Sequence, residues 1–411
     1  MGFFDSPSPA GAGASRAFKQ RRCEPANVHR HEGRWAEAGR DEGKSSANAR
    51  RYSHSPEKPP HPNPLLPAWG RGSLIFIICL CASLLLAACT TPEPLRLHGP
   101  SMGTTWQVTA ITPASRKAEL RACIEQRLDE LIAQMSAWEP GSDLSRFNRA
   151  PAGSWQALPA DLFTVLEHAL ALSAHTRGAY DPTIGPLVDV WGFGPQGESR
   201  STPPSDEDIA AAQARSGAAR LQLDVPQRRA LQPGGLQLDV NSLAPGYAVD
   251  AIAALLHEAG VEAFLVELGG EIRAAGRKPD GRPWRVAVER PDTSANSDFD
   301  IIVELVDAAL GTSGDYRVAF MHEGRRYSHT LDPRTGEPVS HALAAVTVIM
   351  NSADGGSAMA ADARAAALMV LGPEAGMAFA LEHGLAAVFT LRESDGYRRL
   401  ATPAFERYRA R

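Results

Sequence analysis

An uncharged apolar run, Ser73 to Cys89, divides this 411-residue chain into two parts of different character. The run, "SLIFIICLCASLLLAAC", follows Arg71 and ends in small residues before a cysteine. At 17 residues it is short for a membrane span and fits the apolar region of a signal peptide better. Residues 1–72 are rich in Arg, His, Pro, Ser and Gly and have almost no apolar periodicity. We therefore expect them to be disordered, and any packed core to come from the residues after the run.

The run ends in "LAAC", residues 86–89, which resembles a bacterial lipobox. In that motif the cysteine becomes the lipidated first residue of the mature protein. The resemblance implies a lipoprotein signal peptide over residues 73–89 and a lipid anchor on the periplasmic side of a bacterial membrane, expected to be the inner membrane. An uncleaved N-terminal anchor is the alternative, and it leaves the rest of the chain outside the cytoplasm as well. Because such signals begin near the first methionine, we expect the true translation start to lie downstream of Met1.

The charge balance bears on the class of partner. Residues 89–411 keep 30 of the 42 basic and 40 of the 47 acidic side chains, a net charge of −10. Nucleic-acid-binding proteins concentrate Lys and Arg in a patch or stripe. The sequence therefore predicts no nucleic-acid partner.

Helical and strand patterns are mixed in the rest of the chain. Amphipathic spacing predicts helices over residues 118–138, 160–178, 247–260 and 357–372. Alternating or apolar runs predict strands over 104–110, 263–268, 284–289, 300–306, 316–320, 344–350 and 385–391. Several strand runs follow one another directly, without strict βαβ alternation. This pattern predicts the α+β class, with one large mixed or antiparallel sheet and flanking helices in a single domain over residues 95–408.

Four polar segments that contain glycine are candidates for a binding site. They are "GPSMGTTW" (99–106), "GAYDPTIGPLVDVWGFG" (178–194), "LDVNSLAPGYAVD" (238–250) and "GTSGDYR" (311–317). The third is expected to lead from a strand into a helix, so its loop and helix N-terminus could face an anion, and "GTSGDYR" is expected to be a similar loop. The alternative for each is a simple turn. None is a Walker A loop or a Rossmann fingerprint.

A fifth segment, "YSHTLDPRTGEP" (327–338), combines turn formers with a histidine. Asp332, Pro333 and Gly336 are typical of a turn. A turn does not require His329, so this histidine is the candidate functional residue of the segment.

Taken in order, these segments resemble the ApbE family of FAD:protein FMN transferases. The series also includes "MSAWEPGSDLSRFN", "LGGEIRAAG" and "AADARAAALMVLG", and it runs from about residue 95 to the C-terminus. The resemblance implies a Mg²⁺-dependent reaction in which FAD is cleaved at its pyrophosphate and FMN is attached through phosphate to a Thr or Ser of a target protein, releasing AMP. The implied targets are flavin-carrying subunits of Nqr- and Rnf-type redox complexes and related periplasmic proteins.

The resemblance also assigns roles to individual residues. His329 corresponds to the active-site histidine, and a neutral imidazole suits the removal of a proton from a threonine hydroxyl. Met102 and Trp138 are expected to border the flavin, with ordinary core packing as the alternative. The other positions expected to contact FAD are Ala179, Tyr180, Asp181, Asp239, Pro245, Thr312, Ser313, Gly314 and Leu331.

The metal site implied by the family departs from its usual pattern in this chain. Asp362 is present, and an oxygen at Ser242 is expected to face the metal. Ala365 and Ala366 stand where the family often has a second acid and a Thr, so two oxygen ligands are missing. Mg²⁺ is then expected to rest on Asp362, the loop near Ser242, water and the FAD phosphates. A Mg²⁺-dependent FAD pyrophosphatase and a tethered FAD-binding protein without transferase activity remain alternatives.

Overall fold

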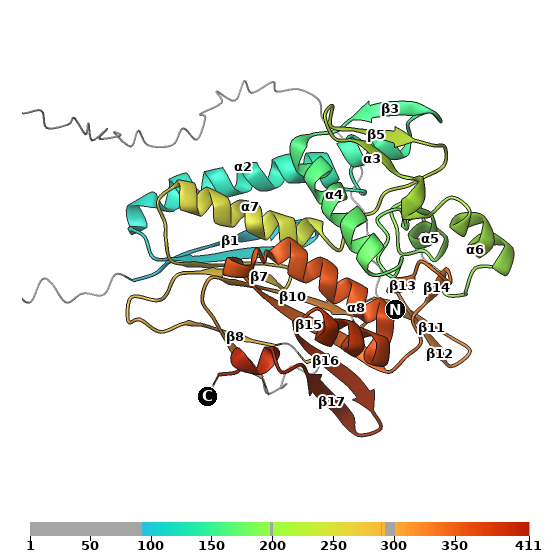
Figure 1. The fold of residues 1–411 in the computed structure, drawn as a ribbon. Coiled ribbons are helices and arrows are strands. Elements are labelled where there is room, and N and C mark those ends of the chain that lie inside the picture. The colour runs from blue at the N-terminus through green and yellow to red at the C-terminus, as the bar shows by residue number, and fades with distance from the viewer. Residues whose placement is uncertain (1–92, 198–199, 289, 292–300, 317, 411) are drawn as a thin grey trace, which may run out of the picture. The chain divides into compact units, whose positions relative to one another are not determined.

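The structure is a computed structural model that describes residues 93–197, 200–288, 290–291, 301–316 and 318–410 (Figure 1). The expected N-terminal extension, the signal peptide over 73–89 and the lipidation site Cys89 lie outside these residues.

An eight-stranded sheet organises the structure. Its strand order is β1-β2-β6-β7-β10-β15-β16-β17, and every neighbouring pair is antiparallel. The predicted α+β class is therefore confirmed, and the sheet is the antiparallel one of the two expected kinds. The strands are β1 Leu95–Ser101, β2 Thr104–Ala110, β6 Phe264–Leu268, β7 Glu271–Ala275, β10 Ala308–Gly314, β15 Leu343–Asn351, β16 Ala386–Glu393 and β17 Gly396–Ala401.

Smaller sheets surround this one. A three-stranded sheet has the order β3-β5-β4, and three further pairs are antiparallel hairpins or ribbons. Their strands are β3 Ser154–Ala157, β4 Gln222–Asp224, β5 Arg229–Gln232, β8 Trp284–Ala287, β9 Ile302–Leu305, β11 Ala319–His322, β12 Arg325–Ser328, β13 Leu331–Asp332 and β14 Glu337–Pro338.

Helices α2, α7 and α8 lie along one face of the large sheet (Figure 1). The helices are α2 Lys117–Met135, α3 Asp143–Asn148, α4 Ala160–His175, α5 Gly185–Val190, α6 Asp206–Gln213, α7 Ala244–Glu258 and α8 Ala358–Glu382. The helical spacing read from the sequence of α2 is confirmed, because its buried residues are Leu120, Ile124, Leu128, Leu131 and Met135.

Strand side chains alternate between the two faces of the sheet. On β15, Val346 and Val348 join an apolar cluster with residues of α8. Ile349 points the other way and joins a cluster with Trp284 of β8 and Val303 of β9. One face is therefore covered by helices and the other by the β8–β9 ribbon, as period-2 alternation requires.

Asp161 of α4 ties three helices together. Its carboxylate accepts hydrogen bonds from Arg127 (2.7 and 2.9 Å) and Gln134 (2.9 Å) of α2, and from the hydroxyl of Tyr247 (2.6 Å) of α7. Burial raises the pKa of Asp161, but these hydrogen bonds outweigh it and hold the pKa at about 2. The side chain is therefore ionised at neutral pH and anchors α2 and α7 to α4.

Helix α8 is long and apolar enough to cross a membrane by composition alone. It instead packs on the sheet, and its backbone leaves the helical conformation at Gly372, directly before Pro373. The sequence predicted that this helix ends at residue 372, and the first helical stretch of α8 does end there. A second helical stretch after the break was not predicted.

Three local predictions were wrong. Residues 311–314 form the end of β10 and are not a loop. The strand expected over 316–320 begins only at Ala319 and belongs to a separate hairpin, β11–β12. Residues 238–240 do not form a strand, and the nearest pairing is an isolated bridge between Ile184 and Gln237.

Candidate active site

The candidate site lies where β10 and the N-terminus of α7 reach α8. A Cβ added to Gly311 of β10 would collide with the backbone nitrogen of Asp362 and lie 2.7 Å from Ala361 C. A Cβ on Gly246 of α7 would lie 2.6 Å from the carbonyl oxygen of Ala358. Only glycine permits approaches this close, so these two residues allow a strand and a helix to meet at Asp362.

Asp362 is a buried carboxylate, with 5% of its surface exposed. Its Oδ2 accepts a hydrogen bond from the backbone N–H of Gly246 at 3.2 Å. Burial raises the pKa of Asp362 well above its usual value, the charge of Glu271 raises it further, and the Gly246 bond opposes both. The N-terminus of α7, which was expected to face an anion, therefore faces this carboxylate. Pro245 lies beside it in the first turn of α7.

Tyr180 and Ser242 extend the site from Asp362. The Tyr180 hydroxyl lies 3.1 Å from Ser242 Oγ, and either oxygen can donate. Burial raises the pKa of Tyr180, the Ser242 bond lowers it, and the nearby charges of Asp362 and Asp239 raise it again. The phenol therefore stays protonated at neutral pH and can serve as a hydrogen-bond donor. The structure brings these predicted residues together from three distant segments of the chain.

Asp181 holds the turn that carries Tyr180. Its Oδ1 accepts hydrogen bonds from the backbone N–H and the hydroxyl of Thr183 (2.8 and 2.6 Å), and its Oδ2 accepts from the N–H of Ala218 at 2.9 Å. Ala179, which precedes Tyr180, is buried. The geometry thus shows how this segment is held, and a contact with FAD at Ala179 or Asp181 stays a prediction.

Asp239 lines a cavity of about 70 Å³ together with Asp189 and Gln196. Burial raises the pKa of Asp239, and two bonds from Asn241 oppose that shift. Burial also raises the pKa of Asp189, and the nearby charge of Asp239 raises it further. Two carboxylates in one small cavity suit the amino groups of a ligand. Sequence reasoning missed Asp189, whose only signal was its place in the segment 178–194.

Met102 and Trp138 differ in their surroundings. Met102 is at the turn between β1 and β2, has φ of 48°, and packs partly buried against the helix-side core. Trp138 follows α2 and is 60% exposed. The core-packing alternative is therefore wrong for Trp138, whose ring is accessible to a flat ligand.

The end of β10 carries the three nucleotide-flanking predictions. The hydroxyl of Thr312 lies 2.9 Å from that of Thr347 on β15, and Ser313 and Gly314 continue the same ladder. All three are partly exposed. They therefore form the polar C-terminal end of β10, in place of the loop that was expected there.

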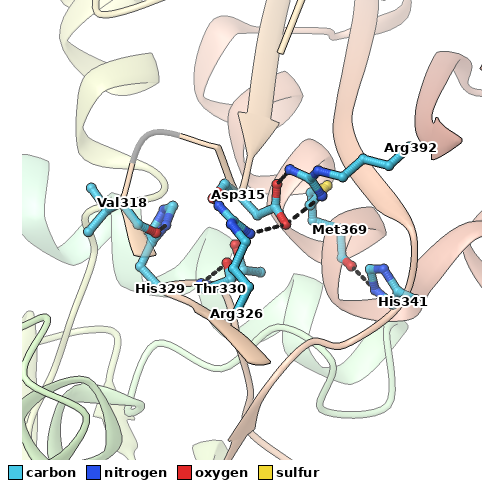
Figure 2. Close-up of polar contacts among 9 residues, drawn as sticks. Asp315, Val318, Arg326, His329, Thr330, His341, Met369 and Arg392 are labelled. Atoms are coloured by element: carbon cyan, nitrogen blue, oxygen red, sulfur yellow. Dashed lines mark hydrogen bonds and ion pairs between the residues drawn. The ribbon is translucent and has the colours of Figure 1, made fainter. Parts of the chain in front are cut away.

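Directly after β10, Asp315 binds two arginines (Figure 2). Its Oδ2 accepts hydrogen bonds from Arg326 Nη1 at 2.7 Å and Arg392 Nη1 at 2.9 Å, and Arg392 Nη2 also bonds Oδ1. The Asp315 side chain is 5% exposed and each arginine side chain 32%. We call these three residues the Asp315 clamp. It fixes β12 to β10 and β16, and sequence reasoning did not identify it.

His329 follows β12, three residues beyond Arg326 of the clamp. Its Nδ1 lies 3.0 Å from the carbonyl oxygen of Val318 (Figure 2), and its backbone N–H donates to the same oxygen at 3.2 Å. Because a carbonyl only accepts, Nδ1 must carry the proton. In the neutral ring Nε2 is then the nitrogen without a proton, which is the form that a general base requires.

The turn after His329 forms as predicted. The N–H of Gly336 donates to the carbonyl of Asp332 at 2.8 Å, Gly336 has φ of 77°, and Asp332 Oδ1 accepts from the N–H of Arg334 at 2.9 Å. Leu331 is buried in an apolar cluster with Trp191, whose Nε1 donates to the carbonyl of Gly336 at 2.8 Å. The Leu331 side chain therefore anchors the hairpin, and its role toward FAD stays a prediction.

The two alanines on α8 occupy different environments. Ala365 is fully buried among apolar residues that include Val346 and Val348. The expectation that Ala365 marks a missing acidic ligand is therefore wrong, because a carboxylate there would enter the core instead of the Asp362 site. Ala366 is partly buried against the helix-side core and lies one turn beyond Asp362 on the same side of the helix.

Within the residues that the structure describes, no three His, Cys, Asp or Glu side chains gather as a metal cluster. The acidic neighbour of Asp362 is Glu271 of β7, also buried. Sequence reasoning quoted its segment, "LGGEIRAAG", without giving Glu271 a role.

Known proteins resemble the chain along most of its length. A protein named FAD:protein FMN transferase from Vibrio cholerae serotype O1 is 37% identical over 341 residues, 80% of this chain and 98% of that protein. A protein of the same name from Escherichia coli K12 is 33% identical, over 82% of this chain and 97% of that protein. The crystal structure of the Pseudomonas stutzeri flavinyl transferase ApbE, in its apo form, is 43% identical with a TM-score of 0.71, covering 78% of this chain and 98% of that one.

The model of the ApbE family matches residues 102–389, which include almost every residue of the site described above. The resemblance read from the ordered motifs is thereby confirmed, and the chain belongs to the ApbE family.

Proposed function

We propose that this chain is an FAD:protein FMN transferase. The observation that carries the proposal is its similarity to proteins of that name over nearly their whole length. The site supports it, because a histidine whose Nδ1 bonds a backbone carbonyl and a group of buried acids come from the segments that the family shares.

In the proposed reaction a Thr or Ser hydroxyl of the target attacks the phosphorus of the FMN half of FAD. The new bond joins the hydroxyl oxygen to that phosphorus, and the bond from phosphorus to the bridging oxygen breaks. AMP leaves with the bridging oxygen. The hydroxyl proton goes to His329 Nε2, while the carbonyl of Val318 holds Nδ1–H and keeps the ring in the required tautomer.

The residues around Asp362 fit Mg²⁺. This ion usually takes one or two carboxylates and completes its octahedron with water and substrate phosphates, so it does not need a cluster of three acids. Asp362 would bind it directly, and an oxygen at Ser242, whose Oγ lies 3.1 Å from the Tyr180 hydroxyl, would face it. When bound, Mg²⁺ neutralises charge on the pyrophosphate. Ala366 offers only a methyl group, so the site would lack an oxygen there.

Flavin contacts are proposed for the partly exposed residues around this centre. Trp138 and Met102 would cover the ring system, and Asp239 would accept hydrogen bonds from amino groups of the ligand. The polar end of β10, with Thr312 and Ser313, would flank the nucleotide.

Location and targets are proposed from the sequence alone. Lipidation at Cys89 would hold the enzyme at the periplasmic face of the inner membrane. There it would meet flavin-carrying subunits of Nqr- or Rnf-type redox complexes, which the family resemblance implies as targets.

Incubation with FAD and MgCl₂, with and without an apo flavoprotein subunit of the Nqr type, separates the candidate functions. The transferase attaches flavin covalently to the subunit and releases AMP in equal amount. FMN and AMP formed without the subunit would indicate a pyrophosphatase instead. Tight FAD binding with no product in either mixture would indicate a binding protein and contradict the proposal.

A further inference from the structure

Glu271 lies on the part of the sheet that packs against Asp362. It is the first residue of β7, and β7 pairs with β10 so that Ile272 lies opposite Leu310. Continuing this ladder by one residue places Glu271 beside Gly311. Paired residues of an antiparallel ladder project to the same face. The face of Gly311 is the one packed against the backbone of Asp362.

The neighbours of Glu271 agree with this orientation. Ile272 and Leu310 both belong to the cluster on the opposite face, with Trp284. Arg273, two residues beyond Glu271, forms an ion pair with Asp250 of α7 at 2.9 Å, which places it on the helix side. Alternation along the strand therefore puts Glu271 on the helix side as well.

Glu271 is 7% exposed and Asp362 is 5% exposed. The negative charges of these two buried carboxylates repel each other. The negative pyrophosphate of the proposed substrate would add to this repulsion. A divalent cation between them relieves both costs. Carboxylate oxygen is the ligand that Mg²⁺ prefers in proteins.

The position also connects to the flavin side of the site. A Cβ on Gly269 would lie 3.3 Å from Glu271 Oε2 and 3.1 Å from the Cγ2 of Thr104. Thr104 begins β2, directly after the turn that holds Met102. Glu271 thus lies between the turn expected to border the flavin and the acid expected to bind the metal.

We propose that Glu271 supplies the second carboxylate of the cation site, opposite Asp362. For the identity of the ion and its diphosphate substrate, this inference rests on the proposed function. Glu271 would thus provide an oxygen ligand from the sheet, whereas Ala366 on the helix provides none.

Direct metal binding tests the assignment without reference to turnover. The metal-free chain is titrated with MnCl₂ alone, because Mn²⁺ takes the same oxygen ligands, and the free ion is counted by its paramagnetic resonance signal. Glu271→Gln keeps the shape and removes the charge. We expect it to weaken Mn²⁺ binding by about tenfold or more, a size typical of lost carboxylate support. Asp362→Asn should do the same.

Glu267→Gln is the matched control. Glu267 lies in the same β6–β7 hairpin and pairs with Ile272, so it projects to the opposite face. This variant should bind Mn²⁺ within about twofold of the parent, well below the expected loss. Glu271→Asp keeps the charge and guards against a folding defect, and it should bind more tightly than Glu271→Gln.

An unchanged affinity in Glu271→Gln, an equal loss in Glu267→Gln, or a parent chain that binds no Mn²⁺ would overturn the inference. Flavin transfer by the parent is measured separately. If transfer fails while Mn²⁺ binding depends on Glu271, the proposed function is wrong and the metal ligand stands. If transfer succeeds while Glu271→Gln binds normally, only the ligand assignment is wrong.

Discussion

Replacing Asp315 with alanine should destabilise the protein measurably, because one buried carboxylate compensates two arginines. Breaking a buried ion pair by removing one partner costs about 3–5 kcal/mol. The side chains of Arg326 and Arg392 are each 32% exposed, so water would screen part of the charge left behind. We therefore expect a loss of about 2–3 kcal/mol in the free energy of unfolding.

Urea denaturation followed by far-UV circular dichroism measures this loss, and the midpoint should fall by about 1 M. Asp280→Ala is the matched control, because Asp280 pairs with Arg282 on the surface, where their side chains are 40% and 76% exposed. That variant should unfold at the same urea midpoint as the parent, because water screens an ion pair this exposed. If Asp315→Ala loses no more than Asp280→Ala, the clamp does not hold β12 in place.

Four further predictions follow from the site and its surroundings. His329→Ala should abolish flavin transfer and leave the FAD dissociation constant, measured by fluorescence quenching, nearly unchanged; transfer at the parental rate would require another base. Ala366→Thr should lower the MgCl₂ concentration needed for half-maximal transfer, and Mg²⁺ titration curves that superimpose on the parent's would contradict this. Ala365→Asp should instead lower the thermal unfolding midpoint, because the new charge enters the core. Cys89→Ala should move the protein from the membrane fraction to a soluble or unprocessed form, and unchanged attachment with an intact N-terminus would exclude lipidation. The pKa of Asp161 is about 2 in the folded protein, below its value near 4 in the unfolded chain. The ionised side chain therefore stabilises the protein fully above about pH 4, and this stabilisation is lost as the pH falls toward 2. The difference in free energy of unfolding between the parent and Asp161→Asn should therefore shrink as the pH falls from about 4 to about 2, measured by acid-unfolding curves. A difference that stays constant would contradict the assigned pKa.

The sequence predicted elements whose pattern is local. The spacing from Leu120 to Met135 defined the buried side of α2, because one helix face meets the core for its whole length. The turn at Asp332 and Gly336 was predicted for the same reason, since the chemistry of a turn lies within a few residues.

Features that depend on distant residues were missed. "GTSG" has the composition of a loop, but Gly311 is glycine because α8 passes directly over β10. Ala365 and Ala366 are neighbours in sequence, and only the packing of α8 on β15 shows which of them enters the core. The Asp315 clamp joins residues that lie 11 and 77 positions away, and no local pattern indicates either arginine.

The intact mass of a target protein reports FMN transfer from FAD without any assumption about the site. Apo flavoprotein subunits of the Nqr and Rnf types are incubated with this protein, FAD and MgCl₂, and then denatured before mass spectrometry. We predict that a subunit gains the mass of FMN less one water, that the adduct maps to a Thr or Ser, and that FMN in place of FAD gives none. Subunits that keep their original mass, while the protein binds FAD, would contradict the account.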